Sequence, residues 1–160
     1  MQGMCYFKRS INLKKYLFLF SLLVAFDLFT KYLVNNFINT SYLYLDGFFG
    51  LEVTYNTGIA WGMLSGHADY TLILSLFVSF WLVSEIYTNQ EENQLFPLFL
   101  ILSGAFGNII ERLYGLIIGN GGKVTDFIVF GPIPNFNVAD SLISVGIAYL
   151  FFSELRSQNE

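Results

Sequence analysis

Four long apolar segments constrain the fold of this 160-residue chain more than any other feature. They cover about residues 16–37, 70–87, 95–113 and 138–155. Each is close to the ~17–25 residues that a helix needs to cross the hydrocarbon core of a bilayer. Only 12% of the residues are charged, whereas soluble domains carry about 25%. The sequence therefore predicts one integral-membrane domain over residues 1–160, mainly α-helical, with four transmembrane helices.

Basic residues near the N-terminus predict the orientation of these helices. Four of them precede the first segment: Lys8, Arg9, Lys14 and Lys15. No small-residue cleavage site follows, so we expect an uncleaved span rather than a signal peptide. Basic residues favour the cytoplasmic side, and the connection at 39–69 contains no Lys or Arg. Both termini should then be cytoplasmic, with the connections at 39–69 and 114–137 outside. The acidic second connection and Lys123 in the third give this topology no support.

The first outer connection has the composition of a β-hairpin. Residues 42–55 are rich in aromatic and β-branched side chains, and Asp46-Gly47 is a turn signal. We expect a small extracytoplasmic sheet that lies on the membrane surface.

The counts of cysteine and histidine exclude several kinds of site. Cys5 is the only cysteine and His67 the only histidine. An intramolecular disulfide is excluded. A Cys-rich or His-ligated zinc site, a Ser-His-Asp hydrolase and a Cys-His protease are all disfavoured. Carboxylates therefore remain the main candidates for chemistry.

Two aspartates beside apolar segments are the leading candidates for that chemistry. Asp126 lies in an expected loop, and Asp140 lies at the start of the fourth segment. Gly131, Pro132 and Pro134 lie between them, so the chain can fold back and bring the carboxyls together. Asp140 alone could simply cap a helix N-terminus. Together, the two carboxyls would share a proton and activate water.

Polar residues within the first and third segments suggest support for such a site. Asp27 and Lys31 lie four residues apart, on one helix face. They could form a structural ion pair or support the active site, and Arg112 is a second candidate partner for Asp27. Asn108 and Arg112 also share a helix face. Arg112 could orient a carboxylate or merely extend toward the interface.

Small residues and an amide complete the set of candidate positions. Ser103 and Gly107 form a small-xxx-small pair that allows close helix packing. Asn56 could donate its amide to a carboxylate or a substrate carbonyl, although a plain turn with Gly58 and Gly62 would also explain it. Trp61 fits an interfacial anchor.

Together these motifs resemble those of the bacterial lipoprotein signal peptidases, also called signal peptidase II. Five motifs in order carry the resemblance: Asp27 with Lys31, residues 56–60, residues 104–108 with Arg112, residues 124–128, and residues 136–140. The resemblance implies four transmembrane helices, a small extracytoplasmic sheet and a surface helix. It also implies an aspartic endopeptidase of the bacterial inner membrane, with its active site at the outer face.

The resemblance further implies roles for individual residues and partners. Asp126 and Asp140 would be catalytic. Six residues would orient the pair or the substrate, or support the site: Asn56, Asn108, Arg112, Asn137, Asp27 and Lys31. The substrates would be diacylglyceryl-modified prolipoproteins, cut just before the lipidated cysteine. Membrane lipids would surround a monomer that needs no metal and no organic cofactor and binds no nucleic acid. Globomycin would inhibit it.

The chain departs from the usual family pattern at four places. Leu28 stands where Gln is common, Glu111 where Asp is usual, and Trp61 where Phe is usual. The loop at 118–122 looks longer than usual, which could alter lid motion. None of these changes removes a catalytic carboxylate. Two alternatives stay open: a proton- or ion-conducting subunit using Asp27 and Lys31, and a catalytically silent relative that only binds lipoproteins.

Overall fold

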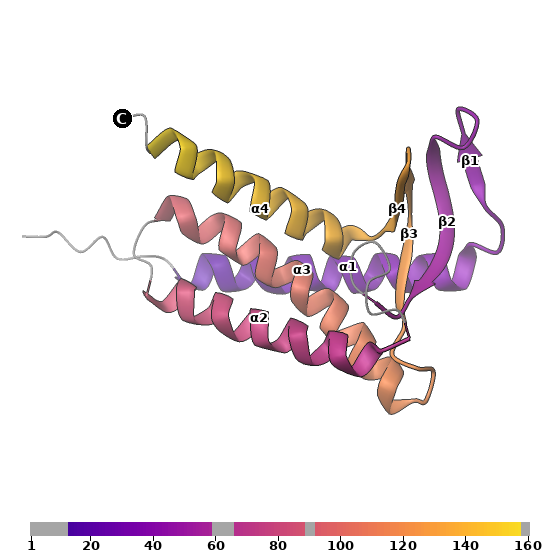
Figure 1. The fold of residues 1–160 in the computed structure, drawn as a ribbon, viewed down its shortest axis with the longest axis horizontal. Coiled ribbons are helices and arrows are strands. Elements are labelled where there is room, and N and C mark those ends of the chain that lie inside the picture. The colour runs from indigo at the N-terminus through magenta and orange to yellow at the C-terminus, as the bar shows by residue number, and fades with distance from the viewer. Residues whose placement is uncertain (1–12, 59–65, 89–91, 158–160) are drawn as a thin grey trace, which may run out of the picture.

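Four helices form the body of the protein, as the sequence predicts. The computed structural model describes residues 13–58, 66–88 and 92–157. The helices are α1 (Leu13–Phe37), α2 (Ala68–Thr88), α3 (Glu92–Ile117) and α4 (Val138–Ser157). All four are long and apolar enough to cross a membrane. They lie side by side, and a small sheet lies at one end of them (Figure 1).

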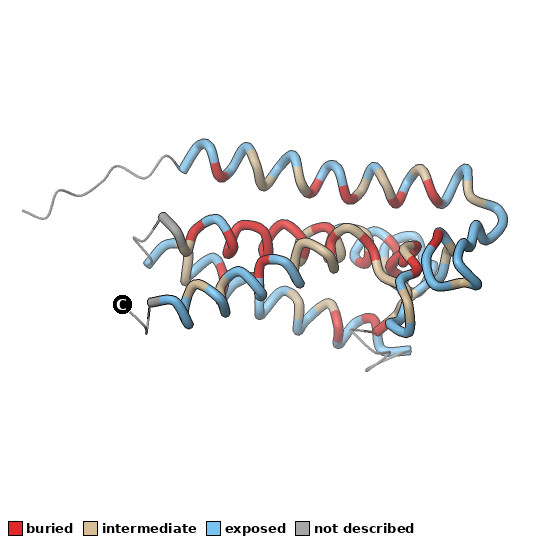
Figure 2. Tube along the Cα trace, turned by 90° about the horizontal axis from the view of Figure 1, so that it is seen from above, coloured by how far each residue is buried: buried red, intermediate tan, exposed pale blue. Residues whose placement is uncertain are grey.

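The burial pattern of α1 explains how an almost wholly apolar helix finds its partners. Its buried residues follow a helical spacing: Tyr16, Val24, Asp27, Lys31 and Val34. Figure 2 shows these positions on the side of α1 that faces the other helices. Its remaining surface is largely exposed and apolar, as expected of a helix face that lipid covers.

Helix α3 is the centre of the bundle, because it packs against each of the other three helices. Its contact with α4 depends on glycine. A Cβ atom on Gly104 would lie 2.3 Å from the Ala139 carbonyl oxygen, and one on Gly146 would lie 2.6 Å from Ile101. A Cβ on Gly107 would lie 2.4 Å from Asp27 Oδ2. Close packing is therefore present at Gly107, as the sequence predicts, and it brings α1, α3 and α4 together near Asp27.

The sheet joins the two connections that the sequence predicts to be outside. Its strands are β1 (Tyr42–Tyr44), β2 (Phe49–Asn56), β3 (Val124–Phe130) and β4 (Ile133–Phe136). All neighbours are antiparallel, in the order β1-β2-β3-β4. The predicted turn at Asp46-Gly47 is present: both residues have positive φ, and the Phe48 N–H donates to the Leu45 carbonyl.

One expectation about this region needs correction. Asp126 lies within β3, not in a loop, and it pairs with Thr54 of β2. The sheet is therefore larger than a hairpin of the first connection, because residues 124–136 supply half of its strands. The surface helix that the resemblance implies is not among the helices of the described residues, and residues 59–65 of the first outer connection lie outside them, so it stays an expectation. Trp61 and Gly62 lie outside the described residues.

The loop at 118–122 begins with a compact helix cap. Gly119 has φ +77. The Asn120 N–H donates to the Gly115 carbonyl, and the Gly119 N–H donates to that of Leu116. This is the Schellman arrangement that ends many helices. It stops α3 and turns the chain toward β3.

Candidate active site

Asn137 organises the candidate site from the start of α4. Its side-chain oxygen accepts a hydrogen bond from the Asp140 N–H at 2.9 Å. Asp140 Oδ2 in turn accepts one from the Asn137 N–H at 3.2 Å. This reciprocal pair is a capping box, so Asp140 does cap its helix. The cap also fixes where the Asp140 carboxyl points.

The same Asn137 side chain binds the other aspartate. Its Nδ2 donates to Asp126 Oδ1 at 2.7 Å, and Asn137 is fully buried. One residue thus contacts both carboxyls, and Asp126 and Asp140 are close enough to interact electrostatically. The two aspartates therefore lie close together, as the sequence predicts, although the segment that carries Asp126 is a strand.

The surroundings of Asp126 change its proton affinity. Only 3% of the residue is exposed. Burial raises the pKa of the Asp126 carboxyl to about 7, and the negative charge of Asp140 acts in the same direction. Hydrogen bonds from Asn56 and Asn137, and the charge of Lys31, lower this pKa but only in part. A carboxyl with such a pKa exchanges protons near neutral pH, as acid–base catalysis requires.

Asn56 occupies the position that both of its predicted roles require. Its Nδ2 donates to Asp126 Oδ2 at 3.1 Å. Its Oδ1 accepts from the Gly58 N–H at 2.8 Å, which closes a local turn. Arg112 then holds the same turn, because its guanidinium donates to the Gly58 carbonyl at 2.9 Å.

Arg112 is buried within the site, so the interpretation of it as an interfacial residue is wrong. It is 4% exposed, so it does not extend toward the membrane surface. It is not the partner of Asp27, and among the described residues it forms no direct ion pair with Asp126 or Asp140. Its guanidinium does interact electrostatically with both of these carboxyls.

Buried Asp27 and Lys31 and half-buried Asn108 form a chain of polar contacts that leads to Asp140. Lys31 Nζ lies 2.8 Å from Asp27 Oδ2 and 2.7 Å from Asn108 Oδ1. Asn108 Nδ2 donates to Asp140 Oδ1 at 2.9 Å. Asp27 Oδ1 accepts from the Ala139 N–H at 2.8 Å, one residue before Asp140. The ion pair therefore links α1 to the residues around Asp140.

Two further residues belong to this network, and sequence reasoning did not assign them to it. Glu111 pairs with Lys31 at 3.2 Å and accepts hydrogen bonds from Thr125. A charge inside an apolar segment was the available signal for Glu111. Thr125 gave no signal beyond its place next to Asp126.

The arrangement as a whole can perform acid–base chemistry on water. It holds two carboxyls close together, three amide side chains that fix their orientation, and two buried cations. Among the described residues, no group of three His, Cys, Asp or Glu side chains could hold a metal ion.

Comparisons with known proteins agree with this chemistry. A family model described as "Signal peptidase (SPase) II" matches residues 19–156. A lipoprotein signal peptidase of Bacillus pumilus is 34% identical over 83% of this chain and 87% of its own length. One from Staphylococcus haemolyticus is 32% identical over 91% of this chain and 97% of its own length. One from Francisella tularensis subsp. mediasiatica is 33% identical over 91% of this chain and 94% of its own length.

Solved structures share the fold as well. One, described as a bacterial membrane enzyme and solved at 2.3 Å, superposes with a TM-score of 0.80 at 26% identity, covering 92% of this chain and 91% of its own. A second solved structure, at 1.9 Å, is also described as a bacterial membrane enzyme. It has a TM-score of 0.76 at 27% identity and covers 90% of this chain and 94% of its own.

Proposed function

The chain belongs to the signal peptidase II family, and on that basis we propose that Asp126 and Asp140 are its catalytic pair. The family consists of aspartic proteases that remove signal peptides from prolipoproteins, and this chain is such a protease. The observation that carries the assignment of the pair is the contact of Asn137 with both carboxyls. Asn56, Asn108, Arg112, Asn137, Asp27 and Lys31 position the pair.

The two carboxyls hold one proton between them at neutral pH, and we assign it to Asp126. Asp126 is buried, and burial raises its pKa to about 7. Asp140 lies at the N-terminus of α4. One of its oxygens accepts a hydrogen bond from the Asn108 amide and the other accepts one from the Asn137 N–H. Such a position stabilises the ionised form of a carboxyl.

Peptide cleavage then follows in two steps. Ionised Asp140 takes a proton from a water molecule, and the water oxygen attacks the scissile carbonyl carbon. Asp126 donates its proton to the carbonyl oxygen, which gives a neutral tetrahedral diol. Asp140 next delivers its proton to the leaving nitrogen as the C–N bond breaks. A diol hydroxyl returns a proton to Asp126, so the pair ends in its starting state.

Finer features of the activity rest on the family resemblance. The substrates are diacylglyceryl-modified prolipoproteins, cut just before the lipidated cysteine. The protein acts as a monomer in the bacterial inner membrane, surrounded by lipid, as one domain over residues 1–160. Its termini are cytoplasmic, its site faces outward, and globomycin occupies that site.

A cleavage assay with purified protein in lipid tests this proposal. Wild type should release the signal peptide from a diacylated prolipoprotein. Asp126→Asn and Asp140→Asn should each abolish detectable cleavage, because each removes one partner in the proton exchange. Asp69→Asn, at the start of α2, is the matched control and should cleave like wild type.

Two outcomes would contradict the proposal. Cleavage by the Asp126→Asn or Asp140→Asn enzyme at the wild-type rate would exclude the pair as catalytic. Equal cleavage of the precursor without its diacylglyceryl group would exclude the proposed lipid dependence.

A further inference from the structure

Thr125 connects the strand that carries Asp126 to the helices. Successive side chains of a strand point to opposite faces, so Thr125 faces away from the side on which Asp126 lies. Thr125 is 1% exposed. Its hydroxyl donates to Glu111 Oε1 at 2.6 Å. Its N–H lies 3.1 Å from both carboxylate oxygens of Glu111.

Helix α1 binds both partners of this contact. Lys31 Nζ pairs with Glu111 Oε2 at 3.2 Å, and Asn35 Nδ2 donates to Thr125 Oγ1 at 2.8 Å. The Tyr55 hydroxyl of β2 donates to Asn35 Oδ1 at 3.0 Å. Thr125 is therefore bonded to α1 and α3 at once.

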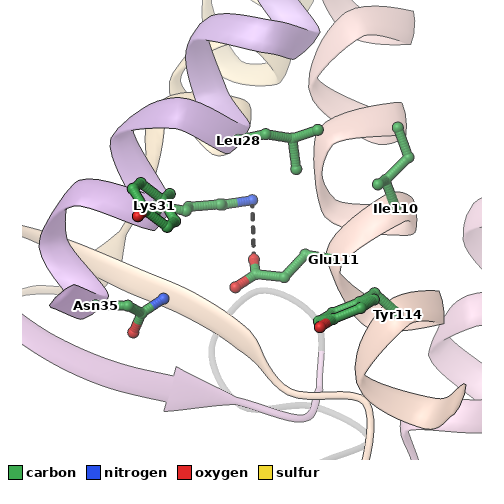
Figure 3. Close-up of a pocket in the computed structure, with 7 residues that line it drawn as sticks. Leu28, Lys31, Asn35, Ile110, Glu111 and Tyr114 are labelled. Atoms are coloured by element: carbon green, nitrogen blue, oxygen red, sulfur yellow. Dashed lines mark ion pairs between the residues drawn. The ribbon is translucent and has the colours of Figure 1, made fainter. Parts of the chain in front are cut away.

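A cavity of about 250 Å³ lies beside this contact, between α1 and α3. In Figure 3, Lys31 and Glu111 point toward each other across it, with Leu28 and Ile110 at its far end. The Glu111 carboxylate borders this cavity, so close packing does not fix its position on this side. Its hydrogen bonds with Thr125 and its ion pair with Lys31 fix it instead.

We propose that Glu111 is a positioning residue for the cleavage reaction, and that it acts through Thr125 to hold Asp126 against Asp140. The inference rests on the proposed function of the two aspartates. Thr125 and Asp126 share a peptide bond, so any shift of Thr125 moves Asp126. The capping box and Asn108 hold Asp140 separately. Loss of the Glu111 contact therefore separates the pair without touching the substrate.

Enzyme kinetics on four variants test the inference. Thr125→Val removes the hydroxyl at constant shape, and Glu111→Gln removes the charge at constant size. Each should lower kcat by about tenfold or more, since small misplacements of reacting groups are costly, and each should leave KM unchanged. Thr125→Ser keeps the hydroxyl and should restore kcat to near wild type. The double variant should lose less than the product of the two single losses, because the Thr125–Glu111 hydrogen bond is counted in both.

Control measurements separate positioning from general damage. Glu85→Gln removes a carboxylate from α2, near the end far from the sheet, and should leave kcat unchanged. Thermal unfolding midpoints of all variants identify any loss of folding. If Thr125→Val does not fold, Glu111→Gln and Thr125→Ser decide the question through the same two kinetic constants.

The possible failures are distinguishable. A wild-type protein without cleavage activity, or active Asp126→Asn and Asp140→Asn enzymes, would overturn the proposed function and this inference together. An active wild type that needs both aspartates, with wild-type kcat in Glu111→Gln or Thr125→Val, would overturn the inference alone. So would a kcat in Thr125→Ser as low as that in Thr125→Val, or a change confined to KM.

Discussion

At the scale of single residues, Asn137 links local folding to the proposed catalytic pair. Its cap with Asp140 is an ordinary way to begin a helix, worth about 1 kcal/mol. The same side chain also reaches Asp126. The cap interpretation and the catalytic interpretation of Asp140 are therefore compatible, because one oxygen of its carboxyl serves the cap and the other faces Asn108.

The pH dependence of cleavage follows from the proton on Asp126. Burial raises the pKa of this carboxyl to about 7, and the protonated form is the active one in the proposed mechanism. We therefore expect kcat to fall as the pH rises through about 7, when Asp126 loses its proton. The hydrogen bond from Asn56 lowers this pKa. Asn56→Ala should therefore move the alkaline limb of the pH profile to higher pH.

Measurements of kcat against pH for wild type and Asn56→Ala test both statements. Three kinds of charged group act on Asp126 besides this amide: the Asp140 carboxyl, the Lys31 ammonium and the Arg112 guanidinium. They are the same in both enzymes, so the comparison isolates the hydrogen bond. An alkaline limb that stays in place, or moves to lower pH, would contradict the role given to Asn56.

At the scale of elements, the sequence predicts the helices better than the strands. An apolar run of membrane-spanning length is a local property, so all four spans could be predicted. Strand β3 is different, because it pairs with β2, which lies far away in the sequence. No pattern within residues 124–130 reveals that partner.

In the candidate site too, features that are local in the sequence could be predicted, whereas contacts between distant segments could not. Asn56, Asn108, Arg112 and Asn137 could be placed near the aspartates because each lies in a recognisable motif. Their individual bonds could not be predicted: Arg112 holds the Gly58 carbonyl instead of a carboxylate. Thr125 and Glu111 meet only after β3 has packed against α3. Such contacts depend on tertiary structure.

The crossing of α1, α3 and α4 at Gly107 is a point where added volume should be harmful. A Cβ there would lie 2.4 Å from Asp27 Oδ2 and 3.3 Å from the Ala139 Cβ. We expect Gly107→Ala to lower the thermal unfolding midpoint, at a cost of about 1–3 kcal/mol for overpacking. It should also slow cleavage, because it displaces Asp27 from the Ala139 N–H beside Asp140.

Val145→Ile is the matched control for Gly107→Ala. It also adds one methyl group, but on a side chain of α4 that is 57% exposed. Thermal unfolding in detergent and the cleavage rate should both stay at wild-type values. An unfolding midpoint of Gly107→Ala equal to that of Val145→Ile would mean that the helices can separate there at no cost.

At the scale of the whole molecule, the sheet and the candidate pair lie together at one end of the bundle. Helix α1 begins, and α4 ends, at the opposite end (Figure 1). The network of Asp27 and Lys31 ends at Asp140. This gives the buried charges a role in the proposed site without any ion conduction.

The orientation of the bundle in the membrane decides on which side this end lies. Lys8, Arg9, Lys14 and Lys15 precede or begin α1 and should keep its start in the cytoplasm. The sheet end then faces outward. We expect a cysteine placed at Asn120, an exposed position after α3, to react with a membrane-impermeant maleimide in intact cells. A cysteine at Leu13, the exposed first residue of α1, should react only after permeabilisation.

Both variants are made in a Cys5→Ser background, because Cys5 is the only native cysteine. Each must still cleave a prolipoprotein, so that the labelled molecules are correctly inserted. Labelling of Leu13→Cys in intact cells, with Asn120→Cys protected, would place the aspartates in the cytoplasm. Diacylated precursors would then have to present their cleavage sites on the inner side, and the outward-facing mechanism would be wrong even if the pair itself is catalytic.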